Sequence, residues 1–414
     1  MGAGAAIMKR TREHIRERKV HRLIPLLRDE AKEPLLRSEV LDATCLAAFE
    51  ASRDTLVELA ALRDGKSGWS TSAWELLSLL ALILDGRIGE AWRRVGRLGD
   101  QPLHSSHLLA IRLALAHNQL DQAVAYARQL AERHPKGERC HPDVTALTSG
   151  FWIQQQANVQ PRPRRRLSLC SSLKNEAEYL EEWVRYHAGI GVDHFYLYDN
   201  GSTDQTPEII AALAKEFSIT SHCIEAQPGQ TIAMNHFLKT HRTETEWVAL
   251  IDGDEFINLE RARQIIDVLR GGGDVAAFAC SWANFGSNGH DATPPGRCVE
   301  AFTRRAEGRN AHVKMIARAD RLIRMVNPHE YMVLGPVLNG AGVQTMIFQG
   351  KIEPPACDEI RINHYMVKSR EQWRAKMKRG RPLPDDHAAK SRDEAFFLNH
   401  DRNEVLDESI LRLV

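Results

Sequence analysis

The sequence has no long apolar run and no ordered set of cysteines. Its longest apolar stretch, Trp74–Leu84, is interrupted by Glu75 and is too short to span a bilayer. The N-terminus has no basic region before an apolar run, and Ala6 stands where myristoylation needs Ser or Thr. No CxxC spacing occurs among the cysteines, which argues against a disulfide framework and a zinc knot; they are Cys45, Cys140, Cys170, Cys223, Cys280, Cys298 and Cys357. We expect a protein of a reducing, cytoplasmic compartment.

An excess of charge of either sign is also missing. Lys plus Arg number 55 and Asp plus Glu number 54, so no global field favours nucleic acid as a partner. The local exception is the stretch 9–22, where basic residues dominate and predict a basic helix over residues 1–24. This helix either contacts anionic lipid at the inner membrane face or is a solvated surface helix.

The chain of 414 residues is long enough for two cores. Over residues 25–158, apolar residues recur at helical steps, which predicts an all-α domain. Within it, Leu84–Trp92 matches Ala116–Val124, with turn positions at Gly86 and Asn118. The pattern resembles tetratricopeptide repeats, with a plain helical bundle as the alternative.

A break rich in Pro and Arg at 160–166 marks the expected domain boundary. Beyond it, short apolar runs predict strands, and longer amphipathic runs between them predict helices. The expected strands are Leu167–Cys170, His194–Tyr198 and Trp247–Ile251, and the expected helices are 176–188 and 206–217. This alternation predicts an α/β domain over residues 166–385, followed by a helical tail over 386–414. In such folds ligands bind beyond the carboxyl ends of the strands.

Polar segments follow all three predicted strands, and the sharpest is Asp252-Gly253-Asp254-Glu255. Carboxylates gathered at the end of a buried strand repel one another and lose hydration. A divalent cation such as Mn²⁺ or Mg²⁺ would compensate them and would also bridge the phosphates of a nucleotide. Gly253 would let the backbone pass close to those phosphates. The alternative is an acidic surface turn.

These motifs, taken in order, resemble the family-2-like and family-92 glycosyltransferases of GT-A fold. The resemblance covers about residues 166–382 and rests on several segments. They are Leu173–Glu176, Glu182-Trp183, Tyr186-His187, Gly191–Asp204, Asp252–Ile257, Trp282, Phe285–His290, His312–Lys314, His329, Asn363–Ser369, Lys376 and Arg379-Gly380. It implies a Rossmann-like domain with a mixed central sheet. It also implies inverting transfer from a nucleotide sugar, usually a uridine diphosphate sugar, with Mn²⁺ or Mg²⁺.

The resemblance also implies roles for particular residues. Asp199 and Glu176 would hold the nucleoside, while Asp252 and Asp254 would hold the metal and the diphosphate. His329 and His364 compete to complete the metal site. The full expected donor-binding set is Lys174, Asn175, Glu176, Asp199, Asn200, Asn235, Asp252, Lys314 and Lys368, with Arg379 as a further candidate for the diphosphate.

Inversion needs a base that removes the proton of the acceptor hydroxyl. Glu300 is the first candidate, and Asp291 and Glu330 stay open. Two other functions are kept beside glycosyl transfer: a nucleotidyltransferase, and an inactive scaffold or binding protein. We expect a saccharide or glycoconjugate acceptor, by analogy in polysaccharide biosynthesis, and a helical domain that recruits the acceptor or a protein partner.

Overall fold

The structure is a computed structural model. It describes residues 34–51, 53–62, 70–95, 103–132, 141–149, 164–226, 228–379 and 393–414, and before them residues 6, 7, 9–11, 13, 23–25 and 27. Most of the basic stretch 9–22 and the first part of the 160–166 break lie outside these residues. Within the described residues, no helix has the length and apolar character needed to cross a membrane.

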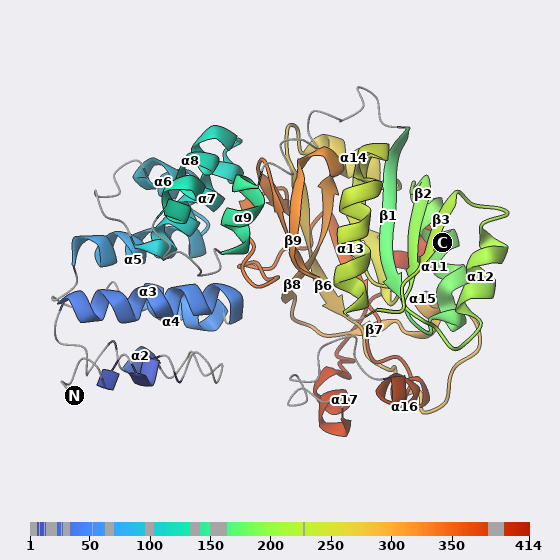
Figure 1. The fold of residues 1–414 in the computed structure, drawn as a ribbon. Coiled ribbons are helices and arrows are strands. Elements are labelled where there is room, and N and C mark those ends of the chain that lie inside the picture. Colours follow the sequence, from blue (N-terminus) through green and yellow to red (C-terminus); the bar gives the residue numbers. More distant parts are fainter. Residues whose placement is uncertain are drawn as a thin grey trace. The chain divides into compact units, whose positions relative to one another are not determined.

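The chain divides into two compact units. One unit comprises residues 1–157 with 334–336 and 344–353, and the other comprises 158–333, 337–343 and 354–414. The first unit is built from helices (Figure 1). They are α2 (Leu23–Pro25), α3 (Pro34–Ala51), α4 (Arg53–Ala61), α5 (Thr71–Leu84), α6 (Ile88–Val95), α7 (His104–Ala116), α8 (Leu120–Glu132) and α9 (Pro142–Thr148).

The two matching sequence stretches fold into two equivalent helix hairpins. Gly86 links α5 to α6 with a φ of 75°, and Asn118 links α7 to α8 with a φ of 59°. Even the turn hydrogen bonds repeat, because Gly86 N donates to Ile83 O and Asn118 N donates to Leu115 O. Glycine and asparagine are the residues that adopt this left-handed conformation most readily. The self-match in the sequence therefore marks a repeated turn.

The helical unit also contains a segment from far along the chain. Residues 344–353, which include β12 (Gln344–Thr345), belong to this unit. Phe348 is buried in its hydrophobic cluster, and Met346 packs against the same cluster. The guanidinium of Arg112 on α7 lies 5.9 Å from the centre of the Phe348 ring. The helical core is therefore completed by residues that lie more than 200 positions later in the sequence, counting from Arg112 to Phe348.

The second unit is built around a mixed sheet, which confirms the predicted α/β class. Its strand order is β11-β6-β8-β4-β1-β2-β3, and β13 pairs with both β5 and β6. The strands are β1 (Arg165–Leu173), β2 (His194–Asp199), β3 (Ile219–Cys223), β4 (Thr245–Leu250), β5 (Glu255–Leu259), β6 (Ala277–Asn284), β7 (Arg304–Arg305), β8 (Asn310–Arg318), β9 (Leu322–Asn327), β10 (Glu330–Val333), β11 (Val337–Asn339), β13 (Ile360–His364) and β14 (Val405–Leu406). The helices are α11 (Ala177–Gly189), α12 (Thr206–Leu213), α13 (Gly229–Thr240), α14 (Ile265–Gly271), α15 (Cys298–Ala301), α16 (Arg370–Arg379) and α17 (Glu394–His400).

Two details of the predicted strands are wrong. The first strand does not stop at Cys170 but continues to Leu173, because β2 pairs with it as far as that residue, although its pairing with β4 ends at Cys170. The strand β3 was not expected, since its residues Ile-Thr-Ser-His-Cys have little apolar character. It lies at the edge of the sheet, where only one neighbour must be matched. The residues 394–414 that the structure describes include the strand β14 as well as helix.

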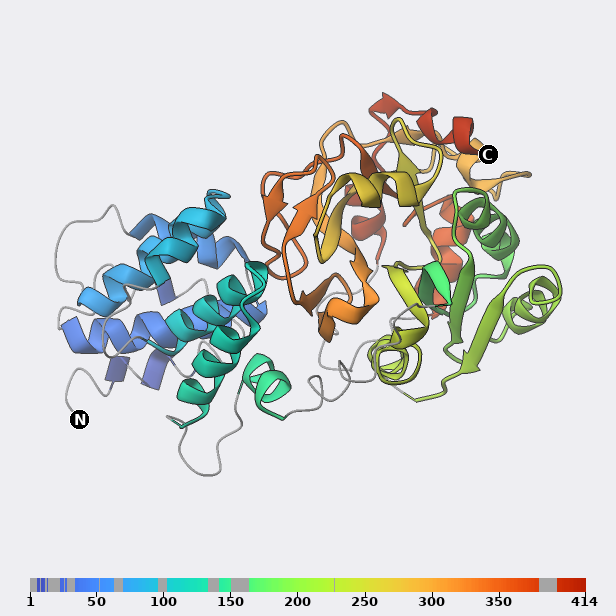
Figure 2. The same cartoon turned by 90° about the horizontal axis from the view of Figure 1, so that it is seen from above.

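Helices cover both faces of the parallel strands. Leu169 packs in the same cluster as Trp183 of α11, whereas the next residue, Cys170, has its sulfur 3.8 Å from that of Met234 on α13. Because side chains alternate along a strand, α11 and α13 must lie on opposite faces. Figure 2 shows α13 on one side of the strands and α11 and α12 on the other.

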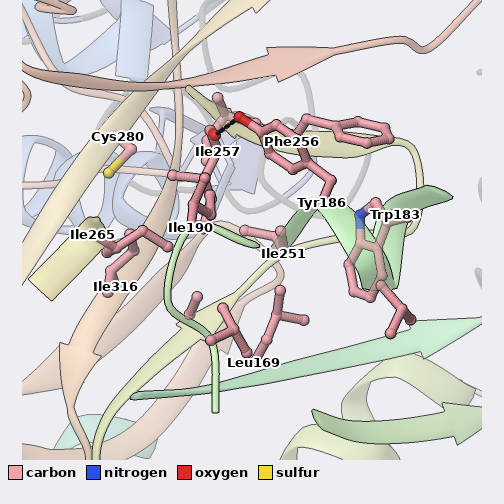
Figure 3. Close-up of a cluster of buried hydrophobic side chains, with 14 of the residues drawn as sticks. Leu169, Trp183, Tyr186, Ile190, Ile251, Phe256, Ile257, Ile265, Cys280 and Ile316 are labelled. Carbon is pink, nitrogen blue, oxygen red and sulfur yellow. Dashed lines mark hydrogen bonds between the residues drawn. The ribbon is translucent and has the colours of Figure 1, made fainter. Parts of the chain in front are cut away.

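The main core ties α11 to the segment that carries the acidic residues (Figure 3). Trp183 donates from Nε1 to the carbonyl oxygen of Glu255 at 2.7 Å, and Tyr186 donates to the carbonyl oxygen of Ile257 at 2.7 Å. All four residues are buried. A buried polar group without a hydrogen bond is costly, so these two bonds fix the position of β5 along α11.

Candidate active site

The carboxyl ends of β1, β2 and β4 meet at one edge of the sheet. Leu173 pairs with Asp199 in the parallel β1–β2 register, and Cys170 pairs with Leu250 in the β1–β4 register. Asp252 therefore follows β4 at about the level where β1 and β2 end. The structure brings the predicted acidic residues to the edge where ligands bind in such sheets.

Asp252 is held by two hydrogen-bond donors. Lys314 Nζ lies 2.7 Å from Oδ2, and Gln230 Nε2 lies 2.7 Å from Oδ1. Lys314 reaches it because β8 runs antiparallel to β4 and pairs Met315 with Leu250. The lysine is almost fully buried, whereas 32% of the Asp252 side chain is exposed. Burial disfavours the ammonium, but Asp252 and Glu255 outweigh it and raise the pKa of Lys314.

Glu255 points inward beneath the turn. Its Oε2 accepts a hydrogen bond from the backbone N–H of Asp252 at 2.8 Å and lies 3.7 Å from Lys314 Nζ. Burial raises the pKa of Glu255 to about 8, and the charges of Asp252 and Asp254 add to the rise although Lys314 opposes it. Glu255 therefore orients the turn and does not face the solvent.

Asp254 contacts a different lysine. Lys376 Nζ of α16 lies 2.5 Å from its Oδ2, and His364 Nε2 lies 3.7 Å from its Oδ1. Burial opposes ionisation, but Lys376 and His364 outweigh it and hold the pKa of Asp254 well below its ordinary value. Lys376 also donates to the carbonyl oxygen of Met366 at 2.9 Å. The carboxylate is therefore ionised and anchored to α16.

These contacts correct one premise of the sequence argument. The acidic residues were expected to need a divalent cation to offset their mutual repulsion. Lys314 and Lys376 each supply a compensating charge from within the protein. Repulsion among the carboxylates is therefore no longer an argument for a metal, and any metal must be argued from ligand geometry.

Of the two histidines proposed for the metal, His364 is the one beside Asp254. It ends β13, which pairs antiparallel with β5 so that His364 lies opposite Glu255. Burial lowers the pKa of His364 although Asp254 raises it, so the ring is neutral at pH 7. Adjacent ligands of an octahedral ion lie about 3.0 Å apart when each is about 2.1 Å from the ion. The 3.7 Å between His364 Nε2 and Asp254 Oδ1 would therefore have to shorten for both atoms to bind one ion, with substrate and water completing the site.

His329 lies a step further away, in an aromatic cluster with His312 and Trp282. Its ring centre is 5.0 Å from that of Trp282, which in turn lies 4.1 Å from that of His364. The Nδ1 atom of His329 is 3.2 Å from the carbonyl oxygen of Val313. Burial, followed by the charge of Lys314, holds the pKa of His329 well below its ordinary value. His329 is therefore a neutral ring packed among aromatic side chains.

Several predicted donor residues line one pocket of about 300 Å³. Its walls include Asn175, Glu176, Tyr179, Lys368, Gln372 and Lys376. Lys368 Nζ lies 4.8 Å from the centre of the Tyr179 ring. Although burial disfavours the ammonium, Glu176 together with other acidic groups, among them Asp254 and Glu178, outweighs it and raises the pKa of Lys368. The pocket thus presents two lysine ammonium groups to a ligand.

Position 253 needs glycine because its backbone lies close to the side chains of Leu173 and Glu176. A Cβ at this position would lie 2.8 Å from Leu173 Cδ2 and 3.2 Å from Glu176 Cγ. The turn after β4 therefore packs on the side chains that follow β1. Gly229 serves a similar purpose, because a Cβ there would lie 2.2 Å from Asn200 Oδ1.

The remaining predicted donor residues fall into two groups. Asp199 Oδ1 accepts a hydrogen bond from the N–H of Ser202 at 3.2 Å, and Asn175 Oδ1 accepts one from the N–H of Thr203 at 2.7 Å. Both side chains therefore stabilise the loop that follows β2. Lys174 is half-buried in the same loop region. Asn235, by contrast, is exposed on α13. The contact from α13 to the acidic residues comes from Gln230.

The three candidate bases lie in different settings. Glu300 of α15 pairs with Arg297 at 2.5 Å, and Asp291 lies 3.5 Å from Arg370 with 91% of its side chain exposed. Glu330 is buried at the start of β10. It is two positions from Pro328, whose carbonyl oxygen accepts from Lys314 at 3.3 Å. The choice among the three stays open.

Two site residues were missed by the sequence argument. Lys376 appeared among the matching motifs but received no role, since a lysine on a polar helix gives no sign of its partner. Gln230 gave no signal at all, because nothing in the sequence shows that α13 begins beside Asp252.

Part of the α/β unit is similar to a known protein family. A family model described as glycosyltransferase family 92 matches residues 165–337. A family 92 protein of Ricinus communis is 28% identical over 225 residues, which are 52% of this chain and 40% of the relative. A family 92 protein of Oryza sativa subsp. japonica is 28% identical over 165 residues, which are 39% of this chain and 28% of the relative. The chain thus spans less than half the length of these relatives.

Among solved structures, a fragment of TarS from S. aureus in complex with UDP is similar. It is 17% identical with a TM-score of 0.26, over 37% of this chain and 47% of that chain. The family match covers the strands from β1 to β10 and the acidic turn, and it agrees with the named relatives, whereas β13 and α16 lie beyond it. Residues 165–337 of this chain therefore match the model of glycosyltransferase family 92, in agreement with the two similar plant proteins.

Proposed function

We propose that this protein transfers a sugar from a nucleotide diphosphate sugar, a uridine diphosphate sugar in the first instance, to a saccharide or glycoconjugate acceptor. One observation carries the proposal. Asp252 and Asp254 stand at the carboxyl edge of the sheet, and Lys376 links Asp254 to a pocket that Glu176 and Lys368 also line. The match to the family 92 model and the names of the relatives support the same reaction class.

In this proposal the pocket holds the donor. Lys368 and Lys376 neutralise the diphosphate, and Asp199 accepts hydrogen bonds from the nucleoside. Preorganised ammonium groups stabilise the charge that develops on the departing nucleotide. Lys314 keeps Asp252 in place, and Glu255 fixes the backbone of the turn from below.

We also propose that Asp254 and His364 hold Mn²⁺ or Mg²⁺ when the donor is bound. Such an ion would offset charge on the leaving diphosphate. The support is the proximity of the two ligand atoms and the neutral state of the histidine. Because Asp254 also contacts Lys376, the diphosphate would face two positive groups, one metal ion and one ammonium.

For inversion we propose a base among Asp291, Glu300 and Glu330. The base takes the proton of the acceptor hydroxyl while that oxygen attacks the anomeric carbon. The variants Asp291→Asn, Glu300→Gln and Glu330→Gln separate the three. Replacing the base is expected to lower transfer by about 10²–10⁴-fold with donor affinity unchanged.

Binding calorimetry with a panel of nucleotide sugars, with and without Mn²⁺, tests the proposal. We expect one uridine diphosphate sugar to bind, and Asp254→Asn to lose that binding. Asp267→Asn, which replaces an exposed carboxylate on α14, serves as the matched control. Equal binding by Asp254→Asn and the parent would refute the site, and turnover of nucleoside triphosphates alone would favour a nucleotidyltransferase.

The two histidines provide the test of the metal. His364→Ala should remove the Mn²⁺-dependent part of donor affinity, whereas His329→Ala should keep it. The reverse result would move the metal to His329, and loss in neither variant would leave the lysines as the cations of the site.

For the helical unit we propose recruitment of the acceptor or a protein partner, in a cytoplasmic setting at or near the inner membrane face. Its support is general, since paired helices offer an extended face. Because Phe348 belongs to this unit, removing residues 1–157 would leave that side chain without its core. Surface substitutions on α6 and α8 in the full chain, followed by acceptor binding, are therefore the appropriate test.

A further inference from the structure

A second cluster of chemically active side chains lies outside the donor site. His222 of β3, His236 of α13 and His241, which follows α13, converge on the sheet face that α13 covers. Each ring offers one nitrogen atom, and the three atoms all lie within 4.8 Å of one another. Among the described residues, no other group of three or more His, Cys, Asp or Glu side chains lies close enough together to hold a metal ion.

We propose that His222, His236 and His241 bind a divalent transition metal of the zinc class. The Nε2 atoms of His222 and His241 are 3.0 Å apart. Ligand nitrogens of a tetrahedral zinc ion, each about 2.0–2.1 Å from the metal, lie about 3.4 Å apart. A small opening of the pair would therefore admit the ion.

The Nδ1 atoms of two of the three rings, those of His241 and His236, already have the hydrogen-bond partners that metal-binding histidines require. Glu244 Oε1 lies 3.0 Å from His241 Nδ1, which forms a carboxylate–histidine pair. The hydroxyl of Tyr198 lies 3.0 Å from His236 Nδ1. Both contacts leave Nε2 of the ring available for a metal and fix the ring orientation.

The carboxylate is itself held in place. Glu244 Oε2 accepts from Arg165 Nη1 at 2.6 Å and from the hydroxyl of Tyr196 at 2.9 Å. The ring of Tyr196 stacks on His241 with centres 4.8 Å apart, and the ring of Tyr198 stacks on His222 at 5.1 Å. The ligands therefore keep their positions before any metal binds, which lowers the entropic cost of binding.

This cluster is separate from the proposed donor site. Gln230, near the start of α13, contacts Asp252, whereas His241 follows the other end of the helix. Eleven residues at about 1.5 Å each place the two ends roughly 16 Å apart. All three histidines are half-buried, so a metal can enter and a water can occupy the fourth position. The expected role is to fasten the edge strand β3 to α13.

Co²⁺ titration of protein without a polyhistidine tag tests the proposal. Four-coordinate Co²⁺ absorbs strongly in the visible range, whereas six-coordinate Co²⁺ at an oxygen site absorbs weakly. We expect one equivalent of the strongly absorbing form, and competition by Zn²⁺. Asp254→Asn should keep this signal, which separates the cluster from the donor site.

Variants then locate the ion. His241→Ala and the more conservative His241→Gln should abolish the signal, Glu244→Gln should weaken affinity by about 10–100-fold, and His117→Ala, in the helical unit, should leave it unchanged. Zn²⁺ should also raise the Tm of the parent but not that of His241→Gln. Thermal unfolding in chelator confirms that each variant is folded. Absence of the strong absorption in the folded parent, or its persistence in the folded His241 variants, would overturn the proposal.

Discussion

The ammonium of Lys314, which is almost fully buried, lies 2.7 Å from Oδ2 of Asp252, which is partly exposed. The cation that compensates Asp252, at the carboxyl edge of the sheet, therefore comes from the neighbouring antiparallel strand β8. Removing either member of a buried ion pair is costly, because the charge that remains is then buried without compensation. This dependence makes Lys314 a structural as well as an electrostatic member of the site.

Replacement of Lys314 by Met should destabilise the protein by about 3–5 kcal/mol, because it leaves Asp252 without its internal cation. Urea unfolding followed by circular dichroism measures the change. Lys215→Met, at an exposed position after α12, should shift stability by no more than about 0.5 kcal/mol. A Lys314→Met protein as stable as the parent would mean that the pair contributes nothing.

Gly253→Ala should weaken donor binding and cost about 1–3 kcal/mol of stability, since the added methyl group would press on Leu173 and Glu176. Calorimetry with the donor and thermal unfolding provide the two measurements. Gly189→Ala is the matched control, because a Cβ there meets no atom within 4 Å. If both variants behave alike, the close approach at Gly253 is unimportant.

Glu255 should make stability fall as the pH rises. Its pKa of about 8 in the folded protein lies above the value of about 4.3 in the unfolded chain. Between these values the folded state binds more protons than the unfolded state, so the free energy of unfolding decreases from about pH 5 to pH 8. Glu255→Gln should flatten this slope in urea titrations at several pH values. An unchanged slope would show that Glu255 is already ionised across the range.

Phe348→Ala should destabilise the helical unit by about 3–5 kcal/mol, because the ring is buried in the cluster formed by that unit. Hydrogen exchange resolved by peptide should show the loss over α5 and α7. Val343→Ala, an exposed position just before the segment, should leave exchange unchanged. Loss of protection confined to residues 344–353 would show that the helices do not depend on the segment.

The sequence determined much of the fold because local patterns reflect local structure. The apolar run before Asp252 identified a central strand, and the match between Gly86 and Asn118 identified two turn positions, which are left-handed in the structure. The order of polar segments after the strands placed the acidic residues at the carboxyl edge, since parallel strands share that edge. The family resemblance followed from the same segments.

Only the tertiary structure decided which partners those residues have. The pairing of Lys314 with Asp252 depends on the register of β8 against β4, and that of Lys376 with Asp254 depends on where α16 packs. His222, His236 and His241 meet because an edge strand with little apolar character lies beside the helix that carries the second histidine. Contacts between residues far apart in the chain leave no periodic trace in the sequence, because side-chain spacing records only the face of an element and not what packs against it.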